Sequence, residues 1–180
     1  MTSSSGSDQL DISEAAAALD GASTMAIVTD EHDANLAATR AVAIELAGRF
    51  GLSIMLYDRS QETWMDTPHP SGPCERNELD ERARSHLNPQ LDEFDAAGIH
   101  ATTYISTVPT ITEIVDVIEH GVDVILLPAK LEHPKLLDRL KGERPADIVD
   151  RVAAMGLDHP VPVLVHAGTK VDLVGPGHRS

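Results

Sequence analysis

The stretch Val122-Asp123-Val124-Ile125-Leu126-Leu127, followed by Pro128-Ala129-Lys130-Leu131, decides the fold of this chain. Five of its first six residues are aliphatic, and Gly121 stands directly before it. A glycine at that place is typical of a helix end. A short apolar run of this kind predicts a strand that is buried on both faces, as in a parallel sheet. In open α/β folds, ligands bind beyond the carboxyl ends of such strands, so the residues from Pro128 onward matter most for function.

Other apolar runs predict further strands, and they alternate with segments of helical spacing. The predicted strands cover residues 25–29, 53–57, 100–106, 122–127 and 161–166, and the predicted helices cover residues 13–19, 35–50, 75–97, 110–120, 133–141 and 145–155. Thr110-Ile111-Thr112-Glu113 has the capping-box pattern of a helix start. The alternation predicts an α/β fold, a doubly wound five-stranded parallel sheet with helices on both faces.

Length, composition and charge limit the kind of protein. The 180 residues suit one domain, and its core must be aliphatic because aromatic residues make up 3% of the chain. We expect a flexible N-terminal extension over residues 1–22, the α/β domain over residues 23–168 and a flexible C-terminal tail over residues 169–180. The net charge of −15 argues against binding to nucleic acid or anionic membranes. No apolar run reaches the ~20 residues of a membrane-spanning helix. The first residues lack a secretory signal, so we expect a cytoplasmic location.

The segment from Asp58 to Cys74 is irregular and rich in proline and glycine. It contains the single tryptophan, Trp64, and the single cysteine, Cys74. One cysteine allows neither an internal disulfide nor a CxxC motif. A long loop in a compact α/β domain is often functional. Trp64 therefore either packs this loop onto the core or forms part of a surface that binds a partner protein.

Three pieces of the sequence carry a resemblance to a known family. They are Ile27-Val28-Thr29-Asp30 with the Ala-rich helix that ends at Gly51, the passage from Gly121 to Leu127, and Ile148-Val149-Asp150-Arg151-Val152 with the later Val161-Pro162-Val163-Leu164-Val165. Together they resemble the universal stress protein family, over about residues 25–167. The resemblance implies a Rossmann-like domain, a stress-response or regulatory role, and a homodimer through the last strand, Val161–Val165. Antiparallel pairing of two such edges satisfies open backbone groups.

The same resemblance bears on ATP. The family's ATP-binding members hold the phosphates with a glycine-rich loop after the fourth strand. By the resemblance, Pro128 replaces the first glycine of that loop, Leu131 replaces the second, and Gly142 lies within one residue of the third. Proline has no N–H and leucine carries a side chain where close approach is needed, so no cofactor is expected and ATP is the alternative. The candidate cofactor-binding residues are Asp30, which matches the family's aspartate near the nucleotide, with Pro128, Lys130 and Gly142.

Acidic residues follow the first predicted strand. Asp30, Glu31 and Asp33 would repel a triphosphate, although Arg59 and Lys130 offset part of this charge. One alternative is that Asp30, Glu31, His32 and Asp33 are ligands of Mg²⁺ or Ca²⁺. The other is that the acidic residues stabilise the following helix through its dipole. We expect the second role and no metal site.

No motif of an enzyme appears in the sequence. The nine histidines lack HxxxH and HExxH spacing, and no nucleophile motif is present. The sequence therefore predicts a non-enzymatic, universal stress protein-like regulatory protein. The alternatives are a nucleotide-binding protein with a divergent phosphate loop, and a scaffold that binds a partner through residues 60–74.

Overall fold

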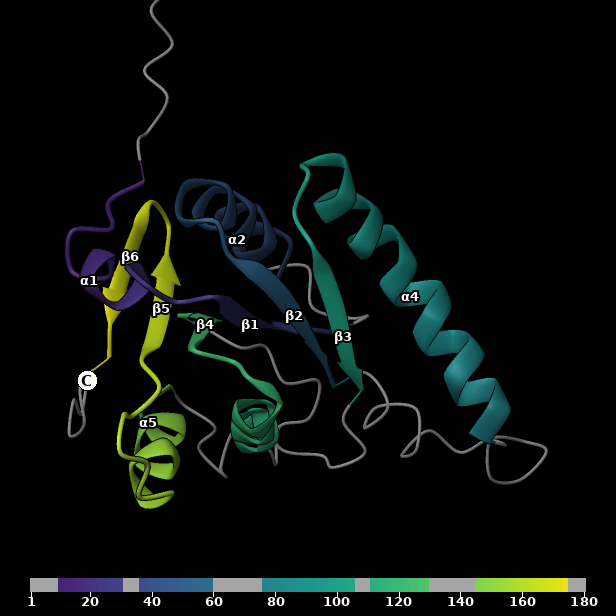
Figure 1. Ribbon diagram of the computed structural model, residues 1–180. Coiled ribbons are helices and arrows are strands. Elements are labelled where there is room, and N and C mark those ends of the chain that lie inside the picture. Colours follow the sequence, from purple (N-terminus) through teal and green to yellow (C-terminus); the bar gives the residue numbers. More distant parts are fainter. Residues whose placement is uncertain (1–9, 31–35, 60–75, 106–110, 130–144, 175–180) are drawn as a thin grey trace, which may run out of the picture.

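The computed structural model describes residues 10–30, 36–59, 76–105, 111–129 and 145–174. Figure 1 shows a central sheet with helices on both of its faces. In chain order the elements are α1 (Ala16–Leu19), β1 (Thr24–Thr29), α2 (Leu36–Phe50), β2 (Ser53–Asp58), α4 (Arg76–Ala96), β3 (Ala101–Ile105), the 3₁₀ helix η1 (Ile111–His120), β4 (Val124–Pro128), α5 (Pro145–Ala154), β5 (Val163–Ala167) and β6 (Lys170–Leu173). Within the described residues, every helix is too short or too polar to cross a membrane.

The sheet has the strand order β3-β2-β1-β4-β5-β6. β1 to β5 run parallel to one another, and β6 runs antiparallel to β5. The predicted α/β fold is therefore confirmed, and the sheet has one strand more than the sequence predicted. The chain moves outward from β1 to β3 and then returns to β4, so the direction of winding changes between β1 and β4. This change is the topological switch point of the sheet.

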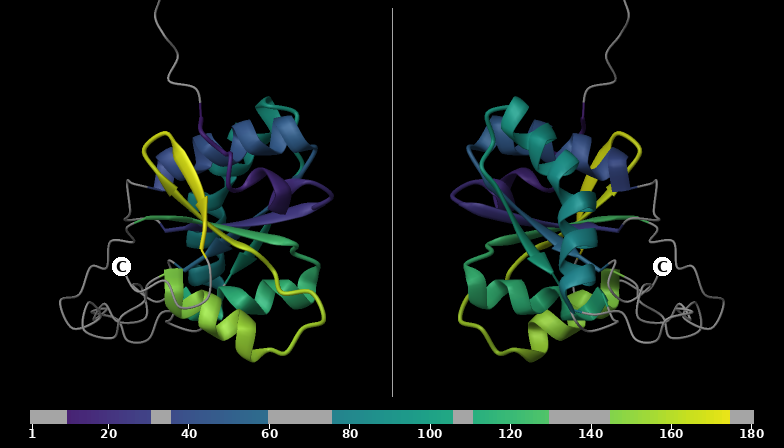
Figure 2. Two further views of the ribbon diagram at one scale, coloured as in Figure 1. Left: turned by 90° about the vertical axis from the view of Figure 1, so that its left-hand side faces the viewer. Right: turned by 90° about the vertical axis from the view of Figure 1, so that its right-hand side faces the viewer.

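Two apolar layers enclose the sheet. Met25, Ile27, Leu46, Leu56 and Phe94 belong to the layer beneath α2 and α4. Ala26, Val28, Ile114, Ile125 and Ile148 belong to the layer beneath η1 and α5. Figure 2 shows α2 on one face of the sheet and η1 and α5 on the other. Alternate residues of β1 thus point to opposite layers, as the pleat of a strand requires.

The apolar stretch from Val122 to Leu127 was predicted to form a buried strand, and β4, Val124–Pro128, is that strand. All five residues of β4 are buried, and Gly121 has the positive φ of 84° that ends η1. The one polar residue of the stretch, Asp123, also has a structural role. Its Oδ2 accepts the backbone N–H groups of Ser23, at 2.8 Å, and Thr24, at 3.1 Å. The side chain of Asp123 thereby joins the start of β4 to the start of β1.

The N-terminal segment differs from the expected flexible extension. Leu10, Ile12, Ala15 and Leu19 are buried in the layer beneath α2 and α4. Leu10 and Ile12 share one side of an extended segment, while Ala15 and Leu19 are four residues apart and share one side of a helical turn. Four apolar residues in that spacing are enough to dock residues 10–22 on the domain.

The C-terminal segment also differs from the expected flexible tail, because residues 170–173 form β6. Gly168, with a φ of 64°, and Thr169 make a two-residue turn between β5 and β6. A glycine at the first position matches the type II′ hairpin turn. Beyond β6, the backbone N–H of Asp11 donates to the carbonyl of Thr169 at 2.8 Å, and the N–H of Val171 donates to the carbonyl of Asp11 at 2.9 Å.

Asp11 and Lys170, which pair at this edge, are exposed. The backbone N–H of Ser13 donates to Asp11 and lowers the pKa of that carboxyl group. A hydrogen bond from Lys170 to Asp172 raises the pKa of the lysine. Both groups therefore keep their charges over the neutral range of pH.

The expected dimer edge needs a correction. The predicted strand Val161–Val165 is observed as β5, Val163–Ala167, and it pairs with β4 on one side and β6 on the other. Its backbone groups are therefore already bonded within the chain, and a second copy could pair there only by displacing β6. The homodimer itself stays a prediction.

Val171 and Leu173 provide a test of the β6 assignment, because Val171 is 1% exposed and Leu173 is 44% exposed. Replacing Val171 by Ala removes buried methyl groups, so we expect the free energy of unfolding to fall by about 1–3 kcal/mol. The Leu173→Ala control is expected to change it by less than about 0.5 kcal/mol. Urea denaturation measures both values. Two unchanged variants would mean that the segment is not docked in solution.

Candidate functional site

The candidate site lies at the carboxyl ends of β1 and β4, where the sheet changes its direction of winding. The chain leaves β1 towards α2 on one face and leaves β4 towards α5 on the other, and this divergence opens a crevice in doubly wound folds. Asp30 directly follows β1, and Pro128 is the last residue of β4. The structure therefore places these two predicted site residues on neighbouring strands at one edge of the sheet. The other two, Lys130 and Gly142, lie outside the described residues.

Asp30 forms a buried ion pair. Nε of Arg59, the residue that follows β2, donates to Oδ2 of Asp30 at 2.9 Å, and the two side chains are 3% and 4% exposed. Thr29 and Asp58 are partners in the register of β1 and β2, so the next residue of each strand, Asp30 and Arg59, also lie side by side. A buried charge needs a close partner of opposite sign, because leaving water is costly. Arg59 thus neutralises Asp30, as the sequence suggested in part.

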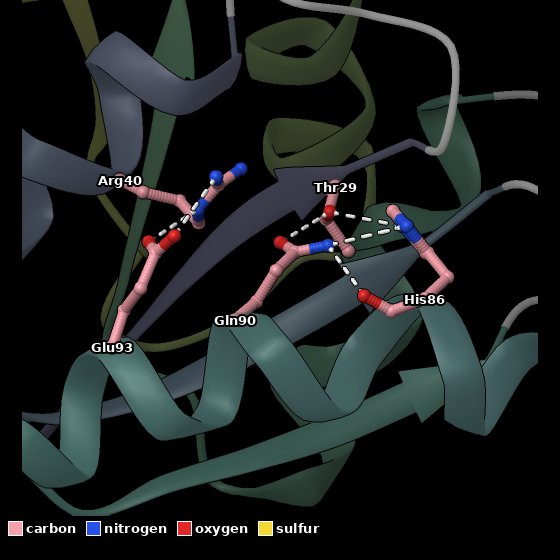
Figure 3. A network of polar contacts seen from close by, with 5 residues as sticks. All are labelled: Thr29, Arg40, His86, Gln90 and Glu93. Atoms are coloured by element: carbon pink, nitrogen blue, oxygen red, sulfur yellow. Dashed lines mark hydrogen bonds and ion pairs between the residues drawn. The ribbon is translucent and has the colours of Figure 1, made fainter.

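A second polar cluster lies beneath α4, on the face of the sheet that α2 and α4 cover. We call Thr29, Asp58, His86 and Gln90 the polar network; Figure 3 shows three of its members. Oγ1 of Thr29 donates to Oε1 of Gln90 at 2.7 Å, and Nε2 of Gln90 lies 3.1 Å from Nε2 of His86. The same His86 nitrogen lies 3.7 Å from Oδ1 of Asp58. Thr29 and Asp58 are fully buried.

This polar network was not predicted from the sequence. A signal for it was present, because His86 and Gln90 are four residues apart and so share one face of a helix. That face also carries the buried Ala83, Leu87 and Phe94. Polar residues within an apolar helix face need polar partners on the sheet beneath it. Those partners are Thr29 and Asp58, which the register of β1 and β2 places side by side, and a register is not visible in the sequence.

The polar network does not have the geometry of a nucleophilic triad. In such a triad, one ring nitrogen of histidine faces the nucleophile and the other faces the carboxylate. Here Nε2 of His86 faces both Oγ1 of Thr29, at 3.5 Å, and Oδ1 of Asp58, at 3.7 Å. The Thr29 hydroxyl donates its proton to Gln90 instead of His86. The contacts therefore attach α4 to the sheet and do not activate a hydroxyl group.

The described residues offer no cluster of three His, Cys, Asp or Glu side chains that could hold a metal ion. Glu31, His32 and Asp33, the alternative ligands of Mg²⁺ or Ca²⁺, lie outside the described part of the chain. The role expected for them at the start of α2 therefore stays a prediction.

The comparisons with known proteins bear on the fold. No protein-family model matches the sequence, and no curated protein matches it either. A universal stress protein family structure from Burkholderia pseudomallei is 14% identical, with a TM-score of 0.51 over 81% of this chain and 96% of its own. A universal stress protein in complex with cAMP is 18% identical, with a TM-score of 0.48 over 82% of this chain and 98% of its own. A universal stress protein from Archaeoglobus fulgidus is 13% identical, with a TM-score of 0.47 over 79% of this chain and 92% of its own. The first of these structures confirms the fold that the resemblance implied.

The ion pair of Asp30 and Arg59 can be tested with one pair of variants. Replacing Arg59 by Met removes the charge next to a buried carboxylate, so we expect the free energy of unfolding to fall by about 3–5 kcal/mol. The control is Arg40→Met. Arg40 pairs with Glu93 at 3.0 Å, and that pair is 15% and 48% exposed, so we expect a loss of less than about 1 kcal/mol. Urea denaturation at neutral pH measures both losses. Equal losses would show that the Asp30–Arg59 pair is not buried in solution.

Proposed function

We propose that this protein is a non-enzymatic stress-response or regulatory protein with the universal stress protein fold, and that its crevice does not bind ATP in the usual way. The observation that carries the proposal is the buried ion pair of Asp30 and Arg59. A carboxylate in a charge-assisted hydrogen bond with arginine is strongly engaged. For Asp30 to orient a nucleotide, the pair would have to open or share its oxygen atoms, at a cost in free energy.

The exit from β4 supports the same proposal. A phosphate cradle needs successive backbone N–H groups that point at the ligand. Pro128 has no N–H, and the N–H of Ala129 donates to the carbonyl of His166 on β5 at 2.8 Å. The first two residues after Leu127 therefore offer no amide to a phosphate group. A cradle in this protein would have to begin at residue 130 or later.

A second candidate function is nucleotide binding through a divergent loop, and one observation favours it. Arg59 neutralises Asp30, so the repulsion that the acidic residues exert on a phosphate group is weaker than the sequence alone suggested. The two candidates differ in one measurable property, the affinity for ATP.

Isothermal titration of the full chain with ATP and Mg²⁺ distinguishes the two candidates. We expect no saturable heat signal, because the Asp30 carboxylate is paired with Arg59 and because Pro128 and Ala129 offer no amide to the nucleotide. A parallel titration with AMP separates the base and ribose from the outer phosphates. A micromolar dissociation constant for ATP would overturn the first candidate and establish the second. Binding of AMP but not of ATP would show that the crevice is open and that the loop after β4 rejects the β- and γ-phosphates.

The remaining expectations stay proposals. The scaffold alternative depends on residues 60–74, which lie outside the described residues. A pull-down with that segment deleted tests it, and an unchanged set of partners would count against it.

The non-enzymatic role is supported by the geometry of His86, whose Nε2 faces both Thr29 and Asp58.

A further inference from the structure

Helix α4 contains a proline in its middle. Pro89 lies inside the helix Arg76–Ala96. A proline has no N–H, so the carbonyl of Ser85, four residues earlier, receives no helical hydrogen bond, and the ring crowds that carbonyl. Such positions are the usual places where helices bend. Pro89 therefore divides α4 into a first part, residues 76–88, and a second part, residues 90–96.

The second part of α4 is firmly attached to the domain. Phe94 is fully buried in the layer that α4 shares with α2. The N–H of Ile99 donates to the carbonyl of Phe94 at 2.9 Å, and the N–H of Gly98 donates to that of Asp95 at 2.8 Å. With a φ of 73° at Gly98, these bonds form a Schellman motif that ends the helix. Nε of Arg40 on α2 also donates to Glu93 at 3.0 Å, as Figure 3 shows.

The described side chains of the first part of α4 are mostly exposed. Of its described side chains, residues 81–88, only those of Ala83 and Leu87 are buried. A polar attachment of this part to the sheet passes through His86, whose Nε2 lies 3.5 Å from Oγ1 of Thr29 and 3.7 Å from Oδ1 of Asp58. A segment with few buried apolar contacts opens at a lower free energy than the rest of a domain.

We propose that α4 is a hinged cover: residues 76–88 open about Pro89 while residues 90–96 remain docked, and the polar network of Thr29, Asp58, His86 and Gln90 holds the first part closed. Each side chain of the network has a place in this arrangement. Gln90, directly after the hinge, contacts Thr29 on β1 and His86 across the hinge. Asp58 on β2 contacts His86 from the sheet.

The opening would expose polar groups at a functional edge of the sheet. Thr29 and Asp58 are the last residues of β1 and β2, and Asp30 and Arg59, the next residues of these strands, form the buried ion pair. A partner or ligand that binds the Asp58 carboxylate would therefore favour the open state, because only that state makes the carboxylate accessible. The hinged cover does not depend on whether the crevice binds a nucleotide.

Hydrogen exchange on the full chain tests the polar network with a matched pair of variants. Thr29→Val removes the hydroxyl that contacts Gln90 and His86, and keeps the branched shape. We expect the amides of residues 81–88 to exchange about fivefold to tenfold faster, as for the loss of one buried hydrogen bond. Thr39→Val is the control, because Thr39 is 1% exposed and its hydroxyl finds no hydrogen-bond partner among the described residues. We expect exchange in α4 to be unchanged in that variant.

The hinge is tested separately by Pro89→Ala, which restores the N–H that the Ser85 carbonyl lacks. We expect residues 81–88 to exchange about tenfold more slowly, and residues 92–97 to change by less than about twofold. The proposal is supported when the two parts of α4 respond differently in Thr29→Val and Pro89→Ala. It is overturned when both parts and β1 change together, which indicates global unfolding, or when neither variant changes the exchange of residues 81–88.

Discussion

The pleat of β1, a strand that is buried on both faces, is the constraint on which this structure depends. In β1 the alternation sends Met25 and Ile27 to the layer beneath α2 and α4, and Ala26 and Val28 to the layer beneath η1 and α5. The same alternation continues into the polar residues at the strand ends. Thr29 therefore contacts α4, while Asp30 points towards the opposite face and pairs with Arg59. One geometric rule thus builds the core and separates two buried polar clusters.

The two clusters lie at the carboxyl edge of the sheet, at the ends of β1 and β2. In doubly wound proteins this edge commonly offers open polar groups and free backbone N–H groups to a ligand. Here the Asp30 carboxylate is bonded to Arg59, and the N–H of Ala129 is bonded to His166. Two of the polar groups at this edge are thus already bonded within the chain, which stabilises the folded structure.

The fold could be predicted from the sequence because its signals are local. The apolar run at Val122–Leu127 and the positive φ of Gly121 act within a few residues, so the position of β4 followed directly. The site was predicted only in part, because the pairing of Asp30 with Arg59 depends on the register of two strands. The β5–β6 hairpin had a local signal in its turn residues, Gly168 and Thr169. Its second strand, β6, has only four residues and is polar at alternate positions, so its sequence resembles that of a flexible tail.

The pairing of Asp11 with the β5–β6 hairpin has a consequence for how the protein is made. Asp11 lies near the start of the chain, while Thr169 and Val171 lie near its end, yet their backbone groups are bonded. Contacts between residues so far apart in sequence form late, because the chain between them must first be ordered. On the ribosome this edge of the sheet can be completed only after residues 170–173 have emerged. Until then, β4 presents an unprotected edge, because its neighbour β5 is made just before β6, and nascent chains are exposed to aggregation at that stage.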